Sequence, residues 1–161
     1  MKTRFEGIVS RRSYGPFAFF CHGKICPVKD KEKYEIVLWK GMAEYMNNRI
    51  GVHRDKQHIY DILLSTSFDQ LAEEIKKLGV ENRKICIVTD STVAGLYLDL
   101  VAGILAGCCK QVISFTFPAG EEHKNLNTVQ ELYKTLIVHR FDRNDVLAAL
   151  GGGVVGDLCG Y

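Results

Sequence analysis

The stretch Val146-Leu-Ala-Ala-Leu150, followed by Gly151-Gly-Gly-Val-Val-Gly-Asp157, decides the fold class of this chain. The apolar run predicts a buried strand, and the glycines predict a tight turn that opens into a helix. Gly151, Gly153 and Gly156 follow the G-x-G-x-x-G spacing, which lets a backbone approach a phosphate or a dinucleotide closely. A turn that needs glycine only for packing is the alternative. Three consecutive glycines are entropically costly to order, which favours ligand binding.

Upstream of this turn, apolar runs alternate with amphipathic stretches. The expected strands cover residues 59–64, 84–89, 111–117 and 146–150. The expected helices cover residues 68–78, 93–106 and 128–139, with Ser67 or Thr66 capping the first, Gly79 ending it, and Thr128-x-x-Glu131 forming a capping box for the last. This alternation predicts an α/β fold, a Rossmann-like, doubly wound parallel sheet with helices on both faces.

Three polar clusters follow the expected strands at their C-terminal ends. They are Asp90-Ser-Thr92, Gly120-Glu-Glu-His-Lys124 and the glycine turn from Gly151 to Asp157. In a parallel sheet these ends share one edge, where ligands bind. We therefore expect the three clusters to converge on a single site.

The chemistry within these clusters leaves alternatives open. Asp90 can accept hydrogen bonds from two ribose hydroxyls, or Asp90 or Ser91 can simply cap the helix that follows. Glu121 and Lys124 can meet a hydroxyl and a phosphate of a nucleotide, although their spacing alone favours a surface ion pair. His123 can reach the cleft or remain solvated.

The N-terminal part of the chain has a different character. Residues 1–56 hold 12 Lys and Arg against 6 Asp and Glu, whereas residues 57–161 hold 9 against 13. Residues 33–48 can form a helix, but nothing links this part to the regular pattern that follows. We therefore expect an N-terminal extension of unknown role over 1–56 and an α/β domain over 57–161. A solvated basic face explains the positive charge of the extension better than a nucleic-acid site.

Composition is typical of a soluble globular protein. The hydrophobic fraction is 47%, the charged fraction is 25%, and no apolar run is long enough to span a bilayer. The N-terminus lacks the apolar core of a signal peptide, so we expect a cytoplasmic location and six free thiols. A metal held by Cys21, His22 and Cys26 is the weaker alternative, because the other close pair, Cys108 and Cys109, is adjacent and poorly spaced for a tetrahedral site.

Three motifs together resemble a known family. Val88-Thr-Asp-Ser-Thr-Val93 with Leu96-Tyr97, Phe117-Pro-Ala-Gly-Glu-Glu-His-Lys124 and Ala149-Leu-Gly-Gly-Gly-Val-Val-Gly-Asp-Leu158 occur in the order and at the distances typical of 3-dehydroquinate synthases. The resemblance covers about residues 57–161 and corresponds to the N-terminal, nucleotide-binding half of that family. Glycerol dehydrogenase, iron-containing alcohol dehydrogenases and 2-deoxy-scyllo-inosose synthase share parts of the pattern. Asp157 in its context is most similar to 3-dehydroquinate synthase.

The resemblance implies an NAD-dependent lyase of the shikimate pathway, which leads to chorismate and the aromatic amino acids. That family converts 3-deoxy-D-arabino-heptulosonate 7-phosphate to 3-dehydroquinate with loss of phosphate. It uses NAD as a transient oxidant and a divalent metal, zinc or cobalt, as a Lewis acid. The resemblance also implies a homodimer when the enzyme is complete, a small-molecule sugar-phosphate substrate, and neither nucleic-acid nor membrane partners.

Carried over position by position, the resemblance implies an NAD site in this chain and no assignable catalytic residue. Asp90 and Thr92 would lie near the adenosine ribose, and Asp157 would face the nicotinamide end. The other residues expected to bind NAD are Ala119, Gly120, Glu121, Glu122, His123, Lys124, Gly152, Gly153, Val154, Val155 and Gly156.

The family's metal ligands, a glutamate and two histidines, lie in a C-terminal helical domain that would follow Tyr161. We therefore expect a fragment of the enzyme that is inactive by itself, with exposed apolar surface that favours dimerisation or aggregation. Two alternatives stay open. One is another sugar-phosphate cyclase or a metal-dependent alcohol or glycerol dehydrogenase of the same superfamily, and the other is a truncated, non-catalytic nucleotide-binding module.

Overall fold

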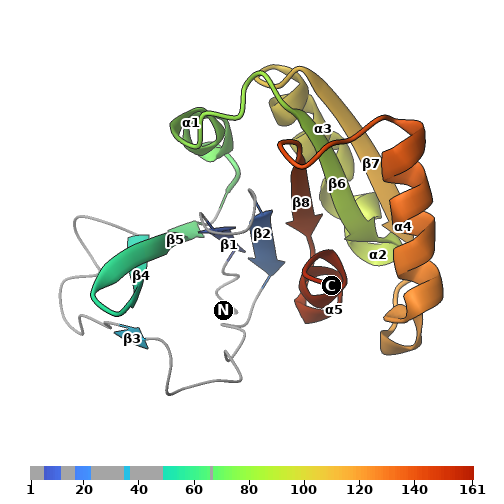
Figure 1. Cartoon of the computed structure of the whole chain (residues 1–161), viewed down its shortest axis with the longest axis horizontal. Coiled ribbons are helices and arrows are strands. Elements are labelled where there is room, and N and C mark those ends of the chain that lie inside the picture. The colour runs from blue at the N-terminus through green and yellow to red at the C-terminus, as the bar shows by residue number, and fades with distance from the viewer. Residues whose placement is uncertain (1–5, 12–16, 23–34, 37–48, 66) are drawn as a thin grey trace.

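The computed structural model describes residues 6–11, 17–22, 35–36, 49–65 and 67–161 of the chain. The strands of these ranges form one eight-stranded sheet in the order β3-β4-β5-β1-β2-β8-β6-β7 (Figure 1). The strands are β1 (Glu6–Arg11), β2 (Phe17–His22), β3 (Glu35–Ile36), β4 (Arg49–Arg54), β5 (Gln57–Ser65), β6 (Lys84–Asp90), β7 (Gln111–Phe117) and β8 (Val146–Leu150). The helices are α1 (Leu71–Lys77), α2 (Ser91–Val93), the π-helix η1 (Ala94–Leu98), α3 (Asp99–Ala106), the 3-10 helix η2 (Glu121–His123), α4 (Leu126–Val138) and α5 (Gly153–Cys159).

One part of the sheet is parallel, as expected. β6 lies between β7 and β8, and β2 pairs parallel with the other side of β8. Asp90 at the end of β6 is opposite Phe117 at the end of β7, and Thr89 is opposite Leu150 at the end of β8. The carboxyl ends of the three strands are therefore level. The strands expected at 84–89, 111–117 and 146–150 are confirmed to within one residue.

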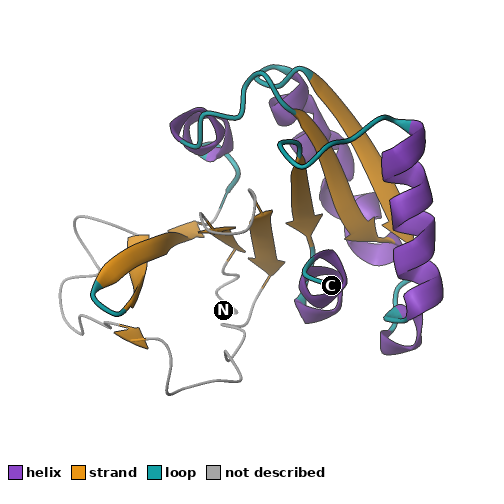
Figure 2. Ribbon diagram, viewed as in Figure 1, coloured by secondary structure: helices purple, strands orange, loops and turns teal. Residues whose placement is uncertain are grey.

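Helices lie on both sides of the parallel strands (Figure 2), and successive residues of the central strand β6 belong to different buried clusters. Ile85 and Ile87 lie in one buried cluster, which they share with residues of α1 and α3. Cys86 and Val88 lie in a second cluster, shared with residues of α4 and α5. This period of two, with apolar residues at every position, is what a strand covered on both faces requires. The doubly wound arrangement with helices on both faces is confirmed.

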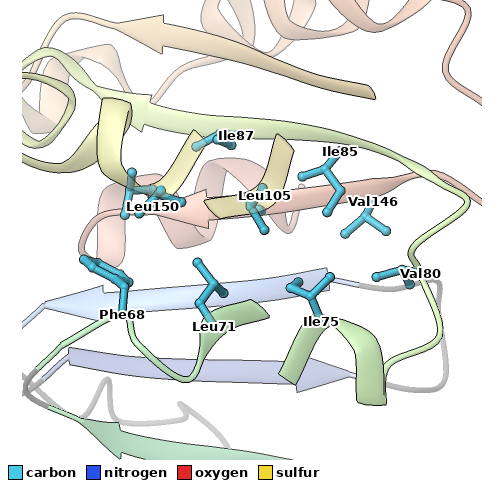
Figure 3. Close-up of a cluster of buried hydrophobic side chains, with 11 residues drawn as sticks. Phe68, Leu71, Ile75, Val80, Ile85, Ile87, Leu105, Val146 and Leu150 are labelled. Atoms are coloured by element: carbon cyan, nitrogen blue, oxygen red, sulfur yellow. The ribbon is translucent and has the colours of Figure 1, made fainter. Parts of the chain in front are cut away.

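The first cluster fixes α1 against the parallel strands. Figure 3 shows Phe68, Leu71 and Ile75 directed toward the strand residues of the cluster. Leu71 and Ile75 are completely or almost completely buried. Their four-residue spacing is the helical period from which the sequence predicted this helix. None of the described helices combines the length and apolar character that crossing a membrane requires.

The strand expected at 59–64 exists as β5, but its partners differ from the expectation. It pairs antiparallel with β4 and with β1 and does not join the parallel strands. β4 and β5 form a hairpin whose turn residues, Asp55 and Lys56, have φ values of 52° and 62°. So short a turn can connect only antiparallel neighbours, because parallel strands need a long crossover. The expected division between residues 56 and 57 falls at this turn and stays a prediction.

Helix starts were predicted less well than strands. α1 begins at Leu71, three residues later than expected, and its N-cap Gln70 makes no side-chain capping bond. The Ser67 hydroxyl donates to the Asp69 carboxylate at 2.7 Å and so does not cap the helix. Thr66, the other expected cap, lies outside the described residues. At the far end of the helix, Gly79 has a φ of 68° and ends it as expected.

Two further expectations about helices are wrong in detail. α4 begins at Leu126 because Asn125 is its N-cap and accepts a hydrogen bond from the Thr128 amide at 3.1 Å, so Thr128 heads no capping box. Glu35–Ile36 forms β3, paired with β4, within the stretch expected to be a helix over 33–48. At Glu35–Ile36, hydrogen bonding to strand β4 at the sheet edge prevails over the helical preference of the local sequence. Residues 33–34 and 37–48 lie outside the described residues.

The amino ends of the parallel strands are held together by Asp145. Its Oδ1 accepts from the Lys84 amide at 3.0 Å, and its Oδ2 accepts from the Asp142 amide at 2.9 Å. Burial raises the pKa of Asp145, but these amides and the Lys84 ammonium outweigh it and leave the pKa below its ordinary value. The start of β6 is thereby tied to the segment that leads into β8.

A network of charges joins the hairpin to α1. The Arg49 guanidinium of β4 donates to Asp61 of β5 at 2.6 Å and to both oxygens of Glu74 of α1 at 2.7 Å. Burial raises the pKa values of Asp61 and Glu74. Hydrogen bonds from His58 and Arg49 to Asp61, and from Lys77 and Arg49 to Glu74, reverse this and leave both pKa values lowered.

We predict that Arg49→Met lowers the free energy of unfolding by about 1–3 kcal/mol, because the charged hydrogen bonds from Arg49 to the buried Glu74 and the half-buried Asp61 are lost. The measurement is urea unfolding at neutral pH. Arg54→Met is the matched control on the same strand, since its one ion pair among the described residues is with the exposed Asp55 at 3.6 Å. Equal losses in the two variants would contradict the prediction.

The same network predicts a pH dependence. Because the folded pKa values of Asp61 and Glu74 lie below their ordinary values of 3.8 and 4.5, their contribution is complete above those values. It is lost as the pH falls through the lowered folded pKa values. The wild-type chain should therefore lose more stability between neutral and acidic pH than Arg49→Met, as judged from unfolding curves at a series of pH values.

Candidate functional site

The three polar clusters meet at the carboxyl edge of the parallel strands, as expected. The Ala119 amide after β7 donates to the Ser91 hydroxyl after β6 at 3.1 Å. The Lys124 ammonium, at the end of the same loop, donates to the Asp157 carboxylate of α5 at 2.7 Å. The loop after β7 is thus bonded to both of its neighbours, and residues from three separate segments form one surface.

Asp90 caps the helix that begins at Ser91. Its Oδ1 accepts from the amides of Thr92 at 2.9 Å and Val93 at 3.0 Å. Both bonds use the same oxygen, and among the described residues Oδ2 has no hydrogen-bond partner. The capping interpretation is confirmed. The ribose interpretation stays a prediction, for which Oδ2 is the acceptor.

The loop after β7 has a fixed backbone and an exposed set of charges. Gly120 has a φ of 133°, a backbone conformation that favours glycine over any residue with a side chain. Glu121, Glu122 and Lys124 are exposed, and His123 is half-buried beside Glu122 at 3.8 Å.

Lys124 carries the positive charge of this surface and is shared by two carboxylates. Its ammonium lies 2.7 Å from Asp157 and 3.3 Å from Glu121. The bond to Asp157, and after it the bond to Glu121, raise the pKa of Lys124 above its ordinary value. The ion pair expected from the Glu121–Lys124 spacing is present, and Asp157 is a second partner that the spacing did not reveal.

The neighbouring glycines Gly151 and Gly152 have different surroundings. A Cβ on Gly151 would meet Val155 Cγ2 at 2.5 Å, and Val155 is completely buried. A Cβ on Gly152 would meet no atom within 4 Å. Gly151 is therefore required by packing, whereas Gly152 leaves space for an approaching ligand. The packing interpretation is confirmed at Gly151, and the ligand-binding interpretation stays a prediction, for which Gly152 offers open space.

The first turn of α5 presents backbone donors to this space. The Gly156 amide makes the first intrahelical bond, to the Gly152 carbonyl at 3.0 Å. The amides of Gly153, Val154 and Val155 precede it and have no intrahelical acceptor. Val155 offers only its backbone, because its side chain is buried, and Asp157 is exposed one turn further on.

Ser91 is a site residue to which the sequence assigned no role beyond possible capping. Its hydroxyl accepts the bond from Ala119 and so joins the loops after two adjacent strands. A serine at the carboxyl end of a strand was a visible signal. The level ends of β6 and β7, which make this partner available, were not.

The described residues contain no group of three or more His, Cys, Asp or Glu side chains arranged to hold a metal ion. The alternative metal site at Cys21, His22 and Cys26 falls on side chains that the structure does not describe. Cys86, Cys108, Cys109 and Cys159 are free thiols, as expected.

Known proteins resemble this chain in sequence. Residues 114–161 match the family model for the N-terminal part of 3-dehydroquinate synthase. The 3-dehydroquinate synthases of Streptococcus suis (strain 05ZYH33) and Streptococcus pneumoniae (strain Hungary19A-6) are 43% identical over 103 and 105 residues. The resemblance to 3-dehydroquinate synthase is confirmed. These alignments cover 63% and 65% of this chain but only 29% of each relative, so the chain spans less than a third of the enzymes it resembles.

Two solved structures of 2-deoxy-scyllo-inosose synthase share the fold. Both are 26% identical to this chain, with TM-scores of 0.50 and 0.52, and cover 56% and 57% of it. They are matched over 25% and 26% of their own length. One of them contains carbaglucose-6-phosphate, NAD+ and Co2+.

We predict that Gly151→Ala lowers the free energy of unfolding by about 1–3 kcal/mol, because the new methyl group overlaps the buried Val155 side chain. Gly152→Ala is the matched control in the same turn. Its φ of −91° suits alanine and its surroundings are open, so its stability should equal that of wild type within about 0.5 kcal/mol. Urea unfolding of both variants is the measurement, and equal destabilisation would refute the distinction.

Replacement of Ser91 by alanine should release the Ala119 amide without unfolding the domain. We expect faster hydrogen exchange at Ala119 in Ser91→Ala, because its acceptor is gone. Exchange at the buried amides of β6 should not change. Ser91→Thr keeps the hydroxyl and should restore slow exchange. NMR-detected exchange is the measurement, and unchanged exchange at Ala119 would contradict the assigned bond.

Proposed function

We propose that this chain is the NAD-binding part of a 3-dehydroquinate synthase. The observation that carries the proposal is the junction of three loops at the level carboxyl ends of β6, β7 and β8. It is made by the Ser91–Ala119 and Lys124–Asp157 contacts. Ligands of doubly wound folds bind at this edge. The motif order and the match of residues 114–161 to the family model support the same assignment.

The residues present fit a dinucleotide. The open space at Gly152 and the amides of Gly153 and Val154 suit a pyrophosphate, which needs close backbone approach and donors at a helix start. Asp90 Oδ2 suits a ribose hydroxyl. The loop residues that would line the nucleotide are Thr92, Ala119, Gly120, Glu121, Glu122, His123 and Lys124.

Lys124 and Asp157 form a balanced pair within this proposed site. A pyrophosphate brings negative charge close to Asp157, and Lys124 offsets part of that repulsion while it holds the carboxylate in place. Asp157 would then present its second oxygen to the nicotinamide end. When bound, NAD supplies a hydride acceptor for a carbinol of the substrate, and the protein residues named here bind and orient it.

The whole reaction proposed is the conversion of 3-deoxy-D-arabino-heptulosonate 7-phosphate to 3-dehydroquinate with loss of phosphate, in a cytoplasmic homodimer. A divalent zinc or cobalt ion would supply Lewis acidity. The described residues hold no ligand set for that ion, so we assign it no residue here and propose that this chain alone is inactive. The likeness to 2-deoxy-scyllo-inosose synthase favours a different sugar-phosphate cyclase as the second candidate.

NAD titration followed by calorimetry tests the proposal. We expect saturable 1:1 binding to the chain, and at least tenfold weaker binding to Gly152→Ala, because its methyl group occupies the space intended for the pyrophosphate. Gly103→Ala is the control, since Gly103 is also surrounded by open space but lies on α3. No binding by wild type at millimolar NAD would refute the proposal, and equal binding by the two variants would refute the placement of the pyrophosphate.

The two candidate reactions are separated by product analysis on a complete protein that contains this chain. We expect it to convert 3-deoxy-D-arabino-heptulosonate 7-phosphate to 3-dehydroquinate. Formation of 2-deoxy-scyllo-inosose instead would favour the other cyclase.

A further inference from the structure

Two adjacent thiols lie in the turn between α3 and β7, away from the proposed NAD site. Cys108 and Cys109 follow the C-cap Gly107, and their sulfur atoms are 4.0 Å apart. Both side chains are half-exposed, whereas Cys86 and Cys159 are buried. The turn lies at the amino ends of the parallel strands, because the Lys110 amide bonds to the Arg83 carbonyl just before β6.

The pair is poorly suited to a disulfide. Residues joined by a trans peptide have Cα atoms about 3.8 Å apart, which is shorter than the roughly 4.4–6.8 Å that disulfides prefer. No cis peptide bond occurs among the described residues. A single atom that bonds both sulfurs is a better fit. At bond lengths of about 2.3 Å, as in zinc–thiolate sites, it holds two sulfurs roughly 3.8 Å apart.

The environment of Cys109 favours its protonated form. Burial, and after it the neighbouring Cys108, raise the pKa of Cys109 to about 12, and the Glu81 carboxylate adds to the effect. Cys108 donates its proton toward the Ile104 carbonyl at 3.4 Å. Electrophiles that react only with a thiolate therefore react slowly with Cys109. A group that bonds both sulfur atoms as it takes up both thiol protons forms an uncharged product. Two neighbouring thiolates, which would repel each other, are then never formed.

We propose that Cys108 and Cys109 form a dithiol site that captures a trivalent organic arsenoxide, or a group of the same thiophilic, doubly bridging chemistry. Two arsenic–sulfur bonds form and the arsenic–oxygen bond breaks. Both thiol protons leave with that oxygen as one water molecule, and no electron is transferred, so no oxidant or reductant is needed. The site is independent of the proposed function, because it lies at the opposite ends of the strands from the glycine turn.

Phenylarsine oxide is the probe, used on the whole chain in a Cys21→Ser, Cys26→Ser background so that these two thiols cannot contribute. Intact mass spectrometry should show one phenylarsenic group per folded chain, formed with loss of one water. A small dithiol should remove it, and an equal concentration of monothiol should not. Cys108→Ser and Cys109→Ser should each lose the adduct while their circular dichroism melting curves remain cooperative.

If a serine variant does not fold, fragmentation of the wild-type adduct in the mass spectrometer tests the proposal by locating the arsenic along the chain. Arsenic located on residues 108–109 supports the site. Arsenic bridging Cys86 and Cys159, an adduct that persists in Cys108→Ser, or no adduct on the folded chain would overturn it.

Discussion

The register of three parallel strands is the constraint on which the rest of the structure depends. β6 is paired with β7 along its whole length and with β8 over five residues, so the carboxyl ends of the three strands are level. A shift of one strand by one residue would move its buried side chains to the opposite layer. It would also separate Ser91 from Ala119 and Lys124 from Asp157. Burial on both faces therefore fixes the geometry of the site, and Asp145 holds the same register at the amino ends.

The site combines rigid and adjustable parts. Glycine is required at Gly120 by a φ of 133° and at Gly151 by the buried Val155 side chain, which a Cβ would overlap. Hydrogen bonds and an ion pair between exposed side chains then join the loops. Such contacts contribute little to stability in water. In the proposed NAD site they would arrange donors and charges before the ligand binds, which lowers the ordering cost of binding.

The strands and the convergence of the clusters could be predicted from the sequence because period-two burial and parallel connections leave few alternatives. The runs at 84–89 and 146–150 are apolar on both faces, as in strands covered by helices, whereas 111–117 carries exposed polar residues between its apolar ones. The helix starts could not be predicted as well, because Ser67, Thr128 and Asn125 are all acceptable capping residues and tertiary packing selects among them. The antiparallel partners of β5 lie in residues 6–11 and 49–54, a part of the chain in which no strand was predicted.

The three consecutive glycines show why a motif alone does not define a site. At Gly151 glycine is needed because the strand end lies against the buried Val155 side chain, and at Gly152 the space beside the backbone is open. The sequence presents the two as equivalent, and only the packing of α5 separates them. A helix that packs this closely brings its first amides to the strand ends, where Lys124 and Asp157 also lie. Close packing at one glycine thus creates the exposed donor surface at the next, and this coupling connects the fold to the proposed NAD site.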